Sequence, residues 1–179
     1  MKKNIFPILI FTLFFVSCVN NSIKEKTITK IDSILTKLDS AKILLAEAKN
    51  DSITIQMKRE LDLKSKQLLV KLDTLALDKK TFTKISAYIN LHKFFKKLNN
   101  KIGEVEINLQ YTINQLNDLK YDVPVLVEKD TAKLNKYLTD EEKAAKIVVN
   151  KVKSLYNSLQ EAKTKYDLLN PLADSLLNN

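Results

Sequence analysis

The 179-residue chain has no tryptophan, only one glycine, one cysteine and one histidine, and three prolines. One glycine cannot supply the glycine-rich loops that hold phosphate groups, nor the frequent tight turns of an all-β fold. One cysteine and one histidine cannot assemble the common nucleophile–base pairs or the usual ligand set of a zinc site. The sequence therefore predicts long helices, no enzymatic activity, no cofactor and no metal.

Arginine is also almost absent. Arg59 is the only arginine among the 30 basic residues, so lysine carries nearly all of the positive charge behind the net charge of +9. Lysine is a strongly hydrated point charge that lacks the planar fork with which arginine holds phosphates. No recognised nucleic-acid-binding motif accompanies the charge. We therefore predict that nucleic acid is not a partner.

The chain begins with a short apolar run. Two lysines precede the apolar residues 5–16, a stretch shorter than the roughly 20 residues that a spanning helix needs. The letters VSC at 16–18 then place the cysteine after a small residue, as in a bacterial lipobox. We interpret residues 1–17 as a lipoprotein signal peptide and Cys18 as the residue that is acylated. The alternatives are a signal peptide with an incidental cysteine, or a short buried segment.

The remainder of the chain has the apolar pattern of helices, with gaps of three and four residues. Residues 18–27 are polar and are predicted to form a lipidated tether, which leaves 28–179 as one helical domain. The first helix is predicted over 28–49, with its end near Asn50 and Asp51. A second helix follows, and the turn after it offers two candidate N-caps for the third helix, Asp78 and Thr81.

The third helix is predicted to be the longest, over 82–119. Gly103 and the asparagine pair at 99–100 argue for a break, because a mid-helix glycine costs about 1 kcal/mol relative to alanine. The apolar stripe nevertheless keeps its phase through Gly103. We therefore predict one continuous helix.

The pattern changes after residue 120. Residues 121–130 are predicted to form a loop, because Pro124 favours an extended residue before it. Thr139 and Glu142 have the spacing of a capping box, which predicts the start of the final helix after one short helical turn. Pro171 is predicted to end that helix.

The fold class that follows is all-α, an elongated bundle of four to five helices. A monomer is predicted because apolar stripes on four segments can bury one another within one chain. The alternative is a parallel coiled-coil oligomer built on the last helix. Lys163 lies off the stripe of that helix, so its truncation is predicted to leave stability unchanged.

Two polar features remain as candidate sites. His92 lies on the apolar stripe, where a partly buried histidine with one hydrogen bond is expected rather than a metal ligand. A lysine row follows it and is the candidate ligand-binding surface, with a solvated helix face as the alternative. Its members are Lys93, Lys96, Lys97 and Lys101. A second set of the same status is Lys143, Lys146 and Lys153.

The leader MKKNIFPILIFTLFFVSC, the NN at 20–21 and the lysine-, asparagine- and isoleucine-rich body resemble the plasmid-encoded surface lipoproteins of Borrelia spirochaetes. In size and character the chain is similar to exported plasmid protein A and its homologue. The resemblance implies an outer-surface location and, for some members, binding of host complement regulators, plasminogen or matrix components. No binding residue carries over, because no internal motif matches.

Two functions are therefore expected as alternatives. The first is an outer-surface lipoprotein that binds a host protein or a sulfated polysaccharide, in adhesion or immune evasion. The second is a structural lipoprotein that organises the envelope without a host ligand. Both place the chain at the cell outer membrane, with the membrane as a partner through the lipid on Cys18.

Overall fold

The computed structural model describes residues 6–72, 74 and 76–178. For residues 6–19 and residue 99, it describes the backbone alone. Four helices make up this part of the chain: α1 (Phe6–Asn50), α2 (Ser52–Leu72), α3 (Lys79–Lys129) and α4 (Thr131–Asn178). No strand occurs among the described residues. The prediction of an all-α bundle is confirmed.

The helices form two compact units, and α1, α3 and α4 each contribute to both. Unit 1 combines the described residues up to Ser40 with Asn108–Val149. Unit 2 combines Ala41–Ile107 with the chain from Asn150 onward.

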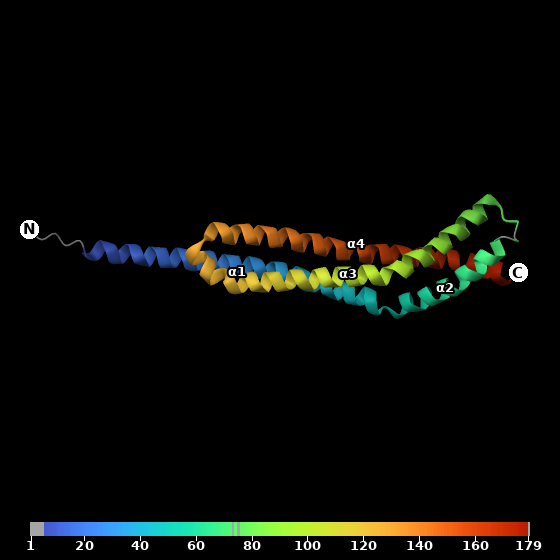
Figure 1. The fold of residues 1–179 in the computed structure, drawn as a ribbon, viewed down its shortest axis with the longest axis horizontal. Helices are drawn as coiled ribbons and strands as arrows, with labels where there is room; N and C mark the ends of the chain where they lie inside the picture. Colours follow the sequence, from blue (N-terminus) through green and yellow to red (C-terminus); the bar gives the residue numbers. More distant parts are fainter. Residues whose placement is uncertain (1–5, 73, 75, 179) are drawn as a thin grey trace, which may run out of the picture. The chain divides into compact units, whose positions relative to one another are not determined.

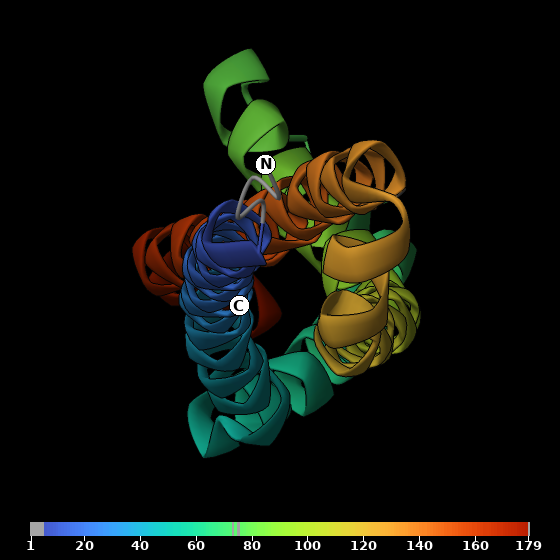
Figure 2. The same ribbon diagram turned by 90° about the vertical axis from the view of Figure 1, so that its left-hand side faces the viewer.

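Unit 1 is built from three helical segments. The first part of α1, the end of α3 and the start of α4 run side by side, with α3 antiparallel to the other two (Figure 1), and Figure 2 shows the three grouped around a common axis. Ion pairs join α1 to both neighbours, at 2.5 Å between Lys120 and Asp32 and 2.7 Å between Lys30 and Glu142. The largest fully buried side chains at its centre are Ile31, Leu38, Leu116, Val123 and Leu134.

Unit 2 contains the end of α1, all of α2, the first half of α3 and the second half of α4. Its centre is larger and includes two aromatic side chains with no exposed surface, Tyr88 and Phe95. Removing such side chains from water supplies most of the favourable free energy of folding. The other fully buried side chains are Leu61, Leu68, Ile85, Val152 and Leu159.

Each break between helices is followed by an aspartate cap. The Asp51 carboxylate accepts a hydrogen bond from the Ile53 backbone N–H at 3.1 Å, and Asp78 accepts from Thr81 N–H at 3.1 Å. Asp130 does the same for Lys133 N–H at 2.9 Å. The capped N–H groups are those that a helix start leaves without intrahelical partners. The predicted break near Asn50 and Asp51 is confirmed, and of the two candidate caps before α3 the structure uses Asp78.

The prediction that α3 continues through Gly103 is also confirmed. A Cβ atom built on Gly103 would have nothing within 4 Å apart from the helix itself and its neighbours in the chain. The helix therefore keeps its stripe in phase, while the missing side chain leaves open space beside it.

The predicted start of the first helix near residue 28 is wrong. The segment 18–27, which we interpret as a tether, is helical as part of α1, and Thr27 is 7 % exposed. The segment contains neither glycine nor proline, so nothing in it interrupts a helix that residues on both sides favour. The polar composition of this segment therefore does not predict a non-helical backbone.

The predicted loop over 121–130 and the predicted helix end at Pro171 are also wrong. Pro124 lies inside α3 and Pro171 inside α4, which runs to Asn178. A proline in a helix removes one backbone hydrogen bond and costs about 3 kcal/mol. Burial on the same stripes opposes that cost, because Val123 and Ala173 have no exposed surface.

The last helix begins earlier than Thr139, at Thr131 after the Asp130 cap. The Thr139 hydroxyl donates at 2.8 Å to the Asn135 carbonyl within the helix, so it forms no capping box. Leu134 and Leu138, 1 % and 7 % exposed, extend the buried stripe of α4 toward its start. The burial of these two leucines explains why the helix begins before Thr139.

Candidate functional site

The predicted lysine row lies on α3 in unit 2, and all four members are exposed. Three of them are separated by four residues and so lie along one face of the helix. None of the four forms an ion pair with a carboxylate in the described part of the chain. Their positive charge is therefore available to an external anion. The row consists of Lys93, Lys96, Lys97 and Lys101.

The second lysine set is exposed as well, but its members are divided. Lys143 and Lys146 belong to unit 1, whereas Lys153 belongs to unit 2. Each of these side chains has the environment of an ordinary solvated lysine. We assign this set no site.

His92 is a partly buried histidine with one hydrogen bond, as predicted. Its side chain is 23 % exposed, and its Nε2 atom lies 3.0 Å from Asp62 Oδ1. Lys66 is the main cause that keeps the pKa of the Asp62 carboxyl below its ordinary value, with His92 adding to it. Among the described residues, no group of three or more histidine, cysteine or acidic side chains is placed to hold a metal ion.

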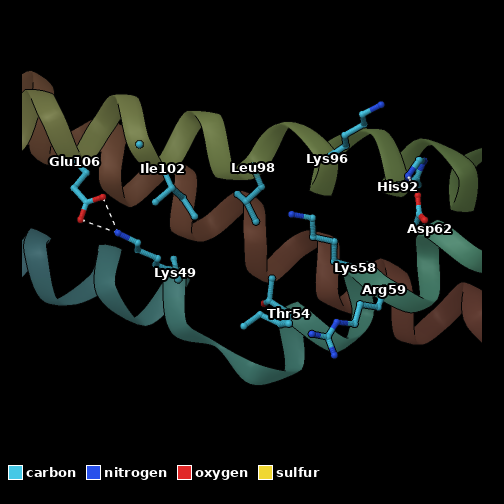
Figure 3. Close-up of a pocket in the computed structure, with 13 residues that line it drawn as sticks. Lys49, Thr54, Lys58, Arg59, Asp62, His92, Lys96, Leu98, Ile102 and Glu106 are labelled. Carbon is cyan, nitrogen blue, oxygen red and sulfur yellow. Dashed lines mark hydrogen bonds and ion pairs between the residues drawn. The ribbon is translucent and has the colours of Figure 1, made fainter.

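A groove of about 760 Å³ opens within unit 2, between α2 and α3. Figure 3 shows Leu98 and Ile102 projecting into it from α3, with Lys58 reaching toward α3 from the opposite side. The groove extends past the interruption of the helix at Asp51, from Lys49 to Thr54, and Gly103 lines it with open space in place of a side chain.

Both carboxylates in the groove wall are already paired. Glu106 accepts two hydrogen bonds from Lys49 Nζ, at 2.9 and 3.1 Å (Figure 3). Asp62 contacts His92 and also accepts from Lys66 Nζ at 2.8 Å. These contacts neutralise the acidic side of the wall.

The cations Lys58 and Arg59 line the same groove without such partners. Neither pairs with a carboxylate among the residues that the structure describes, although Lys58 is half-buried. The third cation, Lys96, lines the groove from α3, but its amine points away from it in Figure 3. The groove therefore presents a net positive charge beside an apolar surface. No pattern in the sequence marks this groove, because only the fold brings residues 48–62 to residues 92–106.

A second polar cluster is structural. The Tyr88 hydroxyl donates to Asn170 Oδ1 at 2.9 Å, and the Tyr166 hydroxyl donates to Glu60. Burial raises the pKa of both tyrosines, so both hydroxyls stay protonated and remain donors. Tyr88 and Tyr166 stack with ring centroids 6.1 Å apart. The cluster thus satisfies buried hydroxyls inside unit 2 and leaves no donor directed at a ligand.

Lys163 is not the dispensable residue that the sequence predicts. Its ammonium pairs with Asp51, and the two side chains are only 18 % and 19 % exposed. Burial opposes the ionisation of Asp51, but hydrogen bonds from Lys163 and Thr54 outweigh it and hold the pKa of Asp51 below its ordinary value of 3.8. The pair joins the start of α2 to α4 within unit 2.

The lipidation prediction concerns Cys18, whose backbone lies in α1 but whose side chain is outside the described part of the structure. In the same described part, no helix carries an apolar stretch long enough to cross a bilayer.

Comparison of the chain with protein-family models, with curated proteins and with solved structures finds no match in any of the three.

Proposed function

We propose that the chain is an outer-surface lipoprotein, anchored through Cys18, that binds an anionic host component through the lysine row of α3. The observation that supports binding best is the exposure of all four row lysines, none of which pairs with a described carboxylate. The resemblance of the leader to spirochaete surface lipoproteins supports the location.

A sulfated polysaccharide is the ligand class that fits the row best. Lysines four residues apart on a helix form a line of point charges about 6 Å apart, which suits a linear polyanion better than a single planar group. An acidic surface on a host protein such as factor H is the second candidate. Either interaction acts through long-range attraction and so depends strongly on ionic strength.

Replacement of the four row lysines by glutamine is expected to weaken heparin binding by at least about tenfold, because the attracting charge is lost. The melting temperature is expected to stay the same, since exposed lysines that pair with nothing stabilise little. Heparin affinity chromatography and calorimetry, each at low and at physiological salt, measure the effect. The variant is Lys93→Gln, Lys96→Gln, Lys97→Gln and Lys101→Gln combined.

The matched control removes four exposed lysines of α4, Lys143→Gln, Lys146→Gln, Lys151→Gln and Lys153→Gln combined, and should retain heparin binding. Equal binding by the quadruple variant and the wild type would contradict the proposed site. If neither binds heparin or factor H, the envelope-organising function becomes the better proposal.

Cys18→Ala is expected to abolish lipid attachment, because the thiol is the only group at the lipobox position that can form the thioether. The product should stay uncleaved or leave the membrane fraction. Metabolic labelling with a fatty-acid analogue measures this, with Ser17→Ala, which keeps a small residue before the thiol, as the control that retains the label. Label on the Cys18→Ala protein would contradict lipidation at this residue.

A further inference from the structure

We propose that the groove between α2 and α3 is a binding site for a single-chain anionic amphiphile, a molecule with an apolar chain and one carboxylate or phosphate head. The groove shares Lys96 with the lysine row, but the proposal rests on Lys58 and Arg59, which do not belong to that row. Two features carry the inference: a groove with an apolar floor beside the exposed side chain of Ile55, and cations next to it that lack described carboxylate partners.

The apolar surface would hold the chain of the ligand. Ile55 of α2 is 46 % exposed and lines the groove, whose floor is formed by buried side chains that are at most 4 % exposed: Leu98, Ile102 and Ala48. Gly103 adds open space where any other residue would place a side chain. Covering Ile55 and the edges of this floor removes apolar area from water, which favours binding by about 25 cal/mol for each Å².

The charges select the head group. The acidic side chains of the wall, Glu106 and Asp62, are held by Lys49, Lys66 and His92. Lys58 and Arg59 are left to interact with a ligand, and Lys58 is half-buried. A half-buried cation without a counter-charge is unfavourable, and an anionic head group would supply that charge. A cationic or neutral head group would leave the positive charge of Lys58 without a counter-charge.

The size of the groove favours a small ligand over a macromolecule. Its volume of about 760 Å³ lies within the range of roughly 300–1,000 Å³ that is usual for small-molecule sites. Sites of that kind combine a mainly apolar lining with a few placed polar groups. A monomeric single-chain lipid, rather than the surface of a bilayer, is therefore the occupant that we infer.

The test compares three ligands with the same ten-carbon chain: decanoate, decanol and decyltrimethylammonium. Calorimetry with the full chain is expected to show binding of decanoate that is at least about tenfold tighter than that of decanol, and none of decyltrimethylammonium, because only the carboxylate meets the cations. Equal binding of all three would overturn the proposal. So would binding to phosphatidylglycerol vesicles without binding of decanoate.

Gly103→Phe locates the site. Its ring would occupy the groove without a clash at Cβ, so decanoate binding should be lost while the melting temperature stays at or above that of the wild type. Gly103→Phe leaves the apolar leader unchanged. Loss of decanoate binding in this variant would therefore also show that decanoate does not bind to the leader. Unchanged decanoate binding by a folded Gly103→Phe protein would overturn the proposal, and heparin binding is expected to be unaffected.

Lys58→Gln with Arg59→Gln tests the head group independently of the groove volume. This double variant should bind decanoate at least about tenfold more weakly than the wild type and decanol equally well. The matched control is Lys80→Gln with Lys84→Gln, two exposed lysines near the start of α3 that do not line the groove. Equal loss in both double variants would show a general charge effect and overturn the assignment of the head group.

Discussion

Phe95→Ala is expected to lower the free energy of unfolding by about 3–5 kcal/mol, the largest effect of any single truncation that we consider. The Phe95 ring has no exposed surface and meets the ring of Phe94 edge to face, with centroids 5.3 Å apart. Its removal takes away both the burial and the contact, and leaves a cavity that a helix cannot collapse to fill. Urea denaturation followed by circular dichroism measures the change.

Phe82→Ala is the matched control, since the same substitution in the same helix removes a ring that is 52 % exposed. We expect it to cost less than about 1 kcal/mol. A Phe95→Ala protein as stable as Phe82→Ala would show that the centre of unit 2 is not packed around this ring.

Asp51→Ala is expected to lower the free energy of unfolding by about 2–4 kcal/mol at neutral pH. About 1 kcal/mol comes from the lost cap of α2. The remainder comes from Lys163, whose side chain is only 18 % exposed and would lose the partner of its ammonium group. Lys163→Met removes the pair but keeps the cap, so it should cost less than Asp51→Ala. Urea denaturation at pH 7 measures both.

The effect of Asp51 should depend on pH. Because the pKa of its carboxyl is lower in the folded chain than its ordinary value of 3.8, ionised Asp51 stabilises the fold at pH values above about 4. That contribution is lost as the pH falls through the folded-state pKa. Wild type and Asp51→Ala should therefore converge in stability below that pH. Asp167→Ala, an exposed carboxylate on α4 with no described ion pair, should change little at any pH.

Apolar spacing was sufficient to predict the fold class and most of the buried stripe. It placed Ile85, Phe95 and Leu159 in the interior, where each is at most 1 % exposed, and it carried the helix through Gly103. Apolar spacing predicts burial in helices because residues three or four positions apart lie on the same face, and this spacing can be read directly from the sequence.

Local signals at the helix ends were less reliable. Pro124 and Pro171 each predict a helix break, but buried side chains on the same stripes outweigh the lost hydrogen bonds. Asp130, the cap that α4 uses, has the same chemistry as Asp78, which was recognised. The signal was present, and the more conspicuous spacing of Thr139 and Glu142 obscured it.

The groove and the Asp51–Lys163 pair were not predictable from one sequence. Asp51 and Lys163 are 112 positions apart, and nothing in the spacing of an otherwise ordinary lysine marks it as the partner of a helix cap. Sequence reasoning can identify charges that repeat along one helix, such as the lysine row. It cannot identify charges that meet only when two helices pack.

The short breaks between the helices affect how readily proteases would cleave the chain. Only Asp51 separates α1 from α2, and only Asp130 separates α3 from α4. A protease binds its substrate as an extended strand of several residues, so a junction of one capped residue offers it little. Residues 74 and 76–78, between α2 and α3, are the other described residues outside the helices, so limited digestion is expected to begin there. In the part of the chain that the structure describes, susceptibility to proteases would thus be concentrated in the connection between α2 and α3.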